Sequence, residues 1–415
     1  MATPSLAMIP SGYKSGKVYS VLPTDGTGDL TFTRASSATR VNQSGLIETV
    51  ATGVPRLDYT DGGCPSLLLE GQSTNLITYS EDFSNAFWNK TSATVATSTL
   101  VSPDGLQGSY KLIPDNGTGG NRSIGNSYTS LTGLHTHTCF AKKGEYDYLT
   151  LRTRNSPSAG VMFDLANGTL SVNLTSAVYV SSEIENYGNG WYRCSITLDP
   201  SQADTVGQLF ISMSVGITGS EDNSFDGNGT SGVYIWGSQF ENLSYPTSYI
   251  PTSGSTVTRI EDTASKTGLS SYINSTEGVV FFKGNLLVND TSQIKSLCLS
   301  DGTSSNIVRI QTSGTSNQIY ARIQIGGSSI IIPFTITDIT QTFALAFLYK
   351  SGALEVYLNG SQIATDSSTF TFTNPLSVLD YSLPGGSGVF NSRTNDIRVY
   401  STVLTSAELI TLTTL

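Results

Sequence analysis

Along most of the chain, apolar and polar residues alternate in short runs that place the apolar side chains on one face of an extended strand. Such runs are LTFTRASSATRV in the first part, HTHTCFAKKG and GWYRCSITL in the middle, and ALEVYLNGSQIA near the end. Gly, Asn and Asp separate them, and Asn359-Gly360 stands where a type I′ hairpin turn is expected. The pattern predicts an all-β protein of antiparallel strands.

The C-terminal stretch LTSAELITLTTL is the one segment with helical character. Thr405 can cap the helix, and Glu408, three residues later, completes a capping box. We therefore expect a short helix at this end of the chain.

Turn-rich segments divide the strands into three blocks. We expect a small N-terminal β region over residues 1–72, a β-sandwich of the jelly-roll type over 73–250, a polar linker over 251–271, and a second β-sandwich over 272–415. The apolar run Leu67–Leu69 is interpreted as a buried strand at the first joint. The first block is too small for a good core of its own, so it should lean on a partner surface.

Composition agrees with strands and excludes several classes of protein. The 415 residues include 20 Tyr and 16 Phe, which supply a core, and the net charge of −10 argues against a nucleic-acid surface. Lys and Arg are scattered, and no apolar run is long enough to span a membrane. The start MATPSLAMIPSGYKSGK lacks a signal-peptide pattern, so we expect synthesis in a cytoplasm and no membrane insertion.

The cysteines are Cys64, Cys139, Cys194 and Cys298, and none has metal-site spacing. Buried structural thiols are the favoured interpretation, with a Cys139–Cys194 disulfide as the alternative.

Aromatic residues near turns are the candidate contacts for a sugar, because their faces stack on sugar rings. Trp191 and Trp236 are flanked by apolar residues and are better interpreted as core. The candidate glycan contacts are Trp88, Tyr146, Tyr148 and Tyr187.

A calcium ion is the only cofactor that the sequence suggests. The loop EDNSFDGNG carries Asp222 and Asp226, whose oxygens suit calcium, although it lacks the EF-hand spacing and a solvated loop is the alternative. His135 and His137 share a strand face without a third ligand, which favours a solvent-exposed pair over a metal site.

Signals for catalysis are poor. The chain has no G-x-S-x-G motif and no E-x-D-x-E strand of the kind that would align carboxylates for glycan hydrolysis. We expect a protein that is not an enzyme.

Longer phrases resemble known families. The run FTRASSATRV…VPRLDY…CPSLLLEGQSTNL…YSEDFSNAFW resembles the N-terminal region of tailed-bacteriophage structural proteins, and VYIWGSQFENLSYPTSYIPTSGSTVTR resembles the end of the carbohydrate-binding-module-like jelly roll that follows it there. FALAFLYKSGALEVYLNGSQIA and NDIRVYSTVLTSAELITLTTL resemble concanavalin A-like, laminin-G-type lectin sandwiches.

The resemblance implies a virion structural protein, such as a tail or head fibre or a capsid decoration, displayed on the particle exterior. Residues 1–72 would dock it to other virion proteins, it would form a homo-oligomer, most simply a trimer, and the sandwiches would attach it to host-surface glycans. The alternatives are a polysaccharide-degrading tailspike and a purely structural spacer. Because the chain is acidic, we expect neutral sugars, bound by stacking and hydrogen bonds rather than by charge, and therefore little salt dependence.

Overall fold

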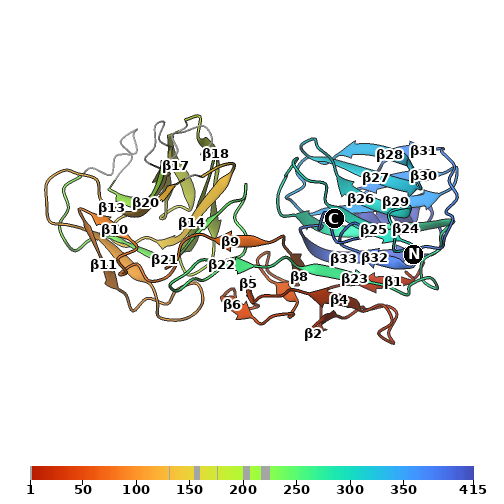
Figure 1. Cartoon of the computed structure of the whole chain (residues 1–415), viewed down its shortest axis with the longest axis horizontal. Helices are drawn as coiled ribbons and strands as arrows, with labels where there is room; N and C mark the ends of the chain where they lie inside the picture. Colours follow the sequence, from red (N-terminus) through yellow and green to blue (C-terminus); the bar gives the residue numbers. More distant parts are fainter. Residues whose placement is uncertain (1, 130, 154–158, 175, 200–205, 216–224) are drawn as a thin grey trace. The chain divides into compact units, whose positions relative to one another are not determined.

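The structure is a computed structural model that describes residues 2–129, 131–153, 159–174, 176–199, 206–215 and 225–415 (Figure 1). These residues form antiparallel strands and the helix α1 (Ser406–Thr413), so the predicted all-β class is confirmed. Thr405 and Glu408 make the expected capping box at the start of α1. Among the described residues, no helix has the length and apolar character needed to cross a lipid bilayer.

The chain forms two compact units, and the first is discontinuous in sequence. Unit 1 consists of Met1–Gln43, Thr49–Gln72 and Ile260–Leu415, whereas unit 2 consists of Ser44–Glu48 and Ser73–Arg259. The bulk of unit 2 is therefore an insertion into a sandwich that begins before it and is completed after it.

Unit 1 contains two sheets, called 1A and 1B. The strand order of sheet 1A is β31 (Ser361–Asp366), β30 (Leu354–Leu358), β29 (Phe343–Lys350), β24 (Glu277–Leu286), β33 (Ser392–Tyr400), β8 (Ser66–Leu69), β7 (Arg56–Asp58), and β1 (Leu6–Met8) also pairs with β33. The order of sheet 1B is β2 (Tyr13–Lys14), β3 (Lys17–Val18), β4 (Leu30–Thr33), β23 (Thr263–Lys266), β32 (Val378–Asp380), β25 (Ser296–Ser300), β26 (Asn306–Thr312), β27 (Gln318–Ile325), β28 (Ser328–Thr335).

One apolar core joins residues of both sheets of unit 1, among them Leu67 of β8, Phe282 of β24 and Ile310 of β26. Sheet 1A also has a second apolar cluster, in which Leu409 and Leu412 of α1 pack with residues of β24 and β29. The helix thus covers apolar side chains of this part of the sheet.

The predicted boundaries of the N-terminal region and the linker are wrong. Strands β1 and β8 pair with β33 in sheet 1A, and β4 pairs with β23 in sheet 1B, so each joins a strand from the C-terminal part of the chain. Strand β7 joins sheet 1A through β8. The supposed linker contains β22 (Val257–Arg259) and β23, and both are paired. The N-terminal strands are too few to form a core of their own, and they share the core of the C-terminal strands of the same chain. The physical reason for expecting a trimer is therefore removed. The oligomeric state stays a prediction.

Unit 2 is a sandwich of two sheets, 2A and 2B. Sheet 2A has the order β10 (Asn89–Thr91), β13 (Ser123–Thr129), β20 (Val206–Ser214), β15 (Tyr148–Thr153), β16 (Gly160–Asp164), β17 (Thr169–Leu174). Sheet 2B has the order β11 (Ala93–Thr97), β12 (Tyr110–Pro114), β21 (Val233–Glu241), β14 (His135–Lys142), β19 (Trp191–Leu198), β18 (Tyr179–Asn186). The short pair of β9 (Ser73–Asn75) with β22 also belongs to unit 2. A separate two-stranded sheet pairs β5 (Ala38–Val41), which belongs to unit 1, with β6 (Ile47–Val50).

Most of the predicted core residues of unit 2 are buried. Trp191 and Trp236 are 2% and 1% exposed and pack with Phe140 and Tyr249, which confirms their assignment to the core. Cys139 and Cys194 are directly opposite each other on β14 and β19, yet both are free thiols. Cys298 is also buried and free, whereas Cys64 is free and exposed.

A buried ion cluster lies in unit 1 where the chain leaves that unit and where it returns. Arg56 of β7 donates to the carboxylates of Glu70 and Asp262, and Arg34 Nη1 donates to Asp262 Oδ1 at 3.1 Å. The Asp262 backbone N–H donates to the Glu70 carbonyl at 2.9 Å, and the Glu70 N–H donates to Asp262 Oδ2 at 2.9 Å. Burial alone would lower the pKa of Arg56, but Asp262 and Glu70 outweigh burial and raise it, so Arg56 is held in its charged form.

Replacing Arg56 by Met leaves the two carboxylates without their shared guanidinium. Because removing one partner strands a buried charge, we expect a loss of roughly 3–5 kcal/mol from the stability of unit 1. All three Trp lie in unit 2, so Trp fluorescence follows unit 2 while circular dichroism follows both units. The denaturant midpoint should fall in circular dichroism and stay unchanged in fluorescence.

The matched control is Lys350→Met, which breaks the exposed cross-strand pair with Glu277 and should cost no more than about 1 kcal/mol. Equal midpoints for Arg56→Met and the control would show that the cluster contributes little.

Candidate functional site

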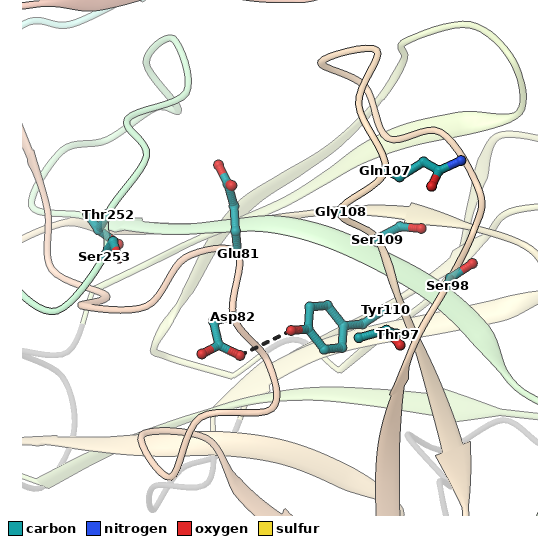
Figure 2. A pocket seen from close by; sticks show the side chains of 10 residues that line it. All are labelled: Glu81, Asp82, Thr97, Ser98, Gln107, Gly108, Ser109, Tyr110, Thr252 and Ser253. Atoms are coloured by element: carbon teal, nitrogen blue, oxygen red, sulfur yellow. Dashed lines mark hydrogen bonds between the residues drawn. The ribbon is translucent and has the colours of Figure 1, made fainter.

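A polar cleft of about 380 Å³ opens in unit 2 (Figure 2). Its walls come from the segment after β9, the hairpin of β11 and β12, and the segment before β22. The lining residues are Glu81, Asp82, Thr97, Ser98, Gln107, Gly108, Ser109, Tyr110, Thr252 and Ser253.

Hydrogen bonds fix the walls of this cleft. On one side, the Ser80 backbone N–H donates to Thr252 Oγ1 at 3.0 Å, and the Thr252 N–H donates to Ser80 Oγ at 2.8 Å. On the other side, the Ser98 N–H donates to the Ser109 carbonyl at 2.9 Å, next to the β11–β12 ladder. In Figure 2, Glu81 projects between Thr252 and Ser253 on one side and Gln107 and Ser109 on the other.

Asp82 is held as an ionised acceptor. Its Oδ1 accepts from the Ser84 hydroxyl at 2.5 Å, from the Ser84 backbone N–H at 3.1 Å and from the Tyr110 hydroxyl at 3.1 Å, the last drawn in Figure 2. The Ser84 hydroxyl is the main cause that lowers the pKa of Asp82 below 3.8. The same turn chemistry recurs at Asp301 and Asp380, each of which accepts from the residue two positions later.

Glu81 is the opposite case. Burial raises the pKa of Glu81 above 4.5, the hydroxyl of Tyr249 at 3.1 Å from Oε1 lowers it in part, and the charge of Asp104 raises it further. Adjacent acids thus have pKa values displaced in opposite directions, one toward the proton-bound form and the other away from it.

The cleft suits a ligand that is rich in hydroxyl groups. Its lining contains the hydroxyls of Ser, Thr and Tyr, the amide of Gln107 and the carboxylates of Glu81 and Asp82, with no Lys or Arg. These groups donate to and accept from neutral hydroxyls, whereas an anionic ligand would meet two acids and no cation. The volume lies at the small end of the about 300–1,000 Å³ typical of ligand pockets.

Another hollow, of about 550 Å³, lies in unit 1 and is lined by residues 352–355 and 365–368. It carries no aromatic ring, and Asp366 accepts there from the backbone N–H of Ser368. It offers fewer convergent polar side chains than the cleft of unit 2.

The structure does not bring the predicted glycan contacts together, and none of them lines the cleft. Trp88 is wrong as a sugar platform: it is 3% exposed, packs against Phe83, and donates from Nε1 to the Tyr79 carbonyl. The half-buried Tyr146 and Tyr187 pack edge-on against Phe225 and Phe140 and belong to different apolar clusters. Tyr148 is half-buried in β15, where its backbone pairs with β16 and β20.

The predicted metal residues form no site in the part of the chain that the structure describes. Asp222 lies outside the described residues, and the exposed Asp226 accepts from the Gly119 backbone N–H at 2.9 Å. Among the described residues, no group of three or more His, Cys, Asp or Glu could hold a metal ion. The expectation of an exposed histidine pair is wrong, because His135 and His137 are buried and burial lowers the pKa of His137 to about 3.

Sequence reasoning missed the residues of the cleft. The acidic-aromatic turn Glu81-Asp82-Phe83 was the available signal, since two acids before a buried Phe are unusual in a chain with so little charge. Its partners Tyr110 and Thr252 are distant in sequence and carry no motif.

Comparisons with known proteins assign no family: no protein-family model and no curated protein matches the chain. Similar solved structures include the Ruminococcus gnavus IT-sialidase CBM40 (16% identity, TM-score 0.30, 35% of this chain and 91% of that one). Another is the botulinum neurotoxin type G receptor-binding domain (14% identity, TM-score 0.28, 36% of this chain and 38% of that one). A third is a leech intramolecular trans-sialidase (17% identity, TM-score 0.28, 34% of this chain and 23% of that one). Similarity at this level assigns neither a family nor a ligand.

Glu81→Gln tests the electrostatics of the cleft. The raised pKa of Glu81 contributes stability below the ordinary value of 4.5, and this contribution is lost as the pH rises through the raised value. Gln cannot ionise, so the melting temperature of the variant relative to the wild type should rise between about pH 4 and pH 7.

Asp82→Asn is the matched variant of opposite sign. The lowered pKa of Asp82 contributes stability above 3.8 that is lost in acid, so the variant should be less stable than the wild type at neutral pH and nearly equal to it in acid. If the melting temperatures of both variants, relative to the wild type, changed with pH in the same direction, the opposite pKa shifts of Glu81 and Asp82 would be contradicted.

Proposed function

We propose that this chain is a non-enzymatic carbohydrate-binding protein of a bacteriophage virion, and that the cleft of unit 2 holds a neutral, hydroxyl-rich sugar of the host surface. The observation that carries the sugar is the lining of the cleft, in which hydroxyl, amide and carboxylate groups converge without a cation. The virion role is supported by the resemblance of the segments around Leu67–Leu69 and Trp236 to phage structural proteins.

The binding chemistry follows from the groups present. Glu81 accepts from sugar hydroxyls, Gln107 both donates and accepts, and the ring of Tyr110 offers an apolar surface. Each neutral hydrogen bond contributes only about 0.5–1.5 kcal/mol net, so one cleft binds weakly. Attachment to a cell therefore relies on several copies that engage the surface together.

A second candidate, glycan hydrolysis, is favoured by one observation. Glu81 and Asp82 have pKa values displaced in opposite directions, as a general acid and its partner carboxylate require. Binding is the better proposal, because Asp82 already accepts hydrogen bonds from Ser84 and Tyr110. These hydrogen bonds stabilise the turn and compete with a role of Asp82 in hydrolysis.

Thr97→Trp tests the cleft without touching the core, because Thr97 is an exposed wall residue. An indole there fills the opening, so binding to the neutral glycan that the wild type selects on an array should fall by at least about tenfold, which corresponds to about 1.4 kcal/mol. Thr94→Trp is the control: it lies on the same strand, is exposed and is not part of the lining.

Undiminished binding by Thr97→Trp would overturn the cleft as the site, and a wild type that binds no glycan would favour the spacer. Reducing-sugar release from host polysaccharide that Glu81→Gln abolishes would establish the hydrolase instead. For the virion role, an antibody to this protein should label the exterior of phage particles; unlabelled particles would exclude it.

A further inference from the structure

Sheet 1B of unit 1 carries an unusual polar row on the face opposite its core. Along β26, Val308 and Ile310 point into the core, so Arg309 lies on the other face. Along β27, Ile323 is in the core and Arg322 lies on the other face. The strands β25 to β28 are neighbours in this sheet (Figure 1).

Arg309 and Arg322 are directly opposite each other on adjacent antiparallel strands. Arg309 is 6% exposed; its Nη2 donates to Gln324 Oε1 at 3.2 Å and its Nε has no hydrogen-bond partner. Arg322 is half-buried and donates from Nε and Nη2 to Ser329 Oγ at 3.2 and 2.7 Å. The described part of the chain supplies neutral oxygens to both guanidinium groups.

Further polar atoms without hydrogen-bond partners lie on the same face, in the cross-strand row of Gln311, two residues after Arg309 on β26. Gln311 is opposite Ser296 on one side and Tyr320 on the other. Gln311 and Ser296 are 1% and 0% exposed, and Gln311 Oε1 and Ser296 Oγ have no hydrogen-bond partner. We call Arg309, Arg322, Gln311, Ser296 and Tyr320 the arginine face.

This arrangement is costly unless an anion compensates it. Like charges directly opposite on a sheet repel, and a buried charge needs a partner. Burial lowers the pKa of Arg309, and the charge of Arg322 lowers it further. The nearest acid in the same cross-strand row, Asp380, is separated from Arg309 by Cys298 and accepts from Ser382 instead.

The other buried arginines of unit 1 show the contrast. Arg34 and Arg56 donate to the carboxylates of Glu70 and Asp262. The fold thus supplies carboxylates to Arg34 and Arg56, whereas at the arginine face the described residues supply neutral oxygens.

We propose that the arginine face binds an acidic saccharide, whose carboxylate accepts from Arg322 and Arg309 while Tyr320 and the neighbouring amides contact its ring and hydroxyls. Planar guanidinium groups match the geometry of a planar carboxylate. This site is on unit 1, differs in ligand charge from the cleft of unit 2, and does not depend on that cleft.

The test uses the full chain and a matched pair of probes: a galacturonic acid trimer and the galactose trimer obtained by reducing its carboxyl groups. Calorimetry should show the acidic trimer bound at least about tenfold more tightly than the neutral one, with the advantage reduced at high salt. Arg322→Gln should abolish the advantage, whereas Lys350→Gln, which removes the same charge from sheet 1A, and Thr97→Trp in the cleft should retain it.

Arg309→Gln adds an independent readout, because removing an uncompensated charge should leave the melting temperature unchanged or raise it. A clear fall in that temperature would show that the chain itself compensates Arg309 and would overturn the proposal. Equal binding of the two trimers, an unaffected Arg322→Gln variant, or competition by sodium sulfate as strong as that of the acidic trimer would also overturn it.

Discussion

The buried cluster of Arg34, Arg56, Glu70 and Asp262 is the constraint on which the architecture of this chain depends. Glu70 precedes the departure of the chain from unit 1 and Asp262 follows its return, and their backbones are bonded to each other. A sandwich interrupted by such a long insertion must hold together the two points where the chain leaves and returns. Without this contact, β8 and β23, which flank the insertion, could each shift in its own sheet. Two buried arginines and two buried acids hold these points together, and Arg56 contacts both acids. Replacing Arg56 therefore leaves Glu70 without the guanidinium it contacts, whereas Asp262 keeps Arg34.

The two proposed binding surfaces follow from the same rule about charge. In the cleft of unit 2, acids are present without cations, and the turn at Asp82 and the hydroxyl of Tyr249 stabilise them. On the arginine face of unit 1, Arg309 and Arg322 donate to neutral oxygens of Gln324 and Ser329. An acidic chain with few Lys and Arg can therefore still hold an anion at one place, so the expectation that charge plays no part in binding applies to the cleft and not to the whole protein.

Local sequence signals were sufficient for three predictions. Alternation predicted the all-β class, Thr405 and Glu408 predicted the capped C-terminal helix, and flanking apolar residues predicted the burial of Trp191 and Trp236. These signals could not reveal that Leu67–Leu69 pairs with Ser392–Thr394, since strand pairing across such a sequence distance leaves no local signal. Trp88 was misjudged because its exposure is decided by Phe83 and Phe87 rather than by the turn before it. The cleft could not be predicted from the sequence, because its walls come from segments far apart in the chain.

Residues before and after the insertion form one sandwich, closed by the buried cluster. The most direct measurement is thermal unfolding of a chain that lacks residues 73–259 and joins Gln72 to Ile260 through a short glycine linker, beside a chain of residues 272–415 alone. We expect a cooperative β-sheet transition for the joined chain and none for residues 272–415, which lack β1, β4, β7, β8 and β23. Cooperative unfolding of residues 272–415 alone, or an unfolded joined chain, would contradict this architecture.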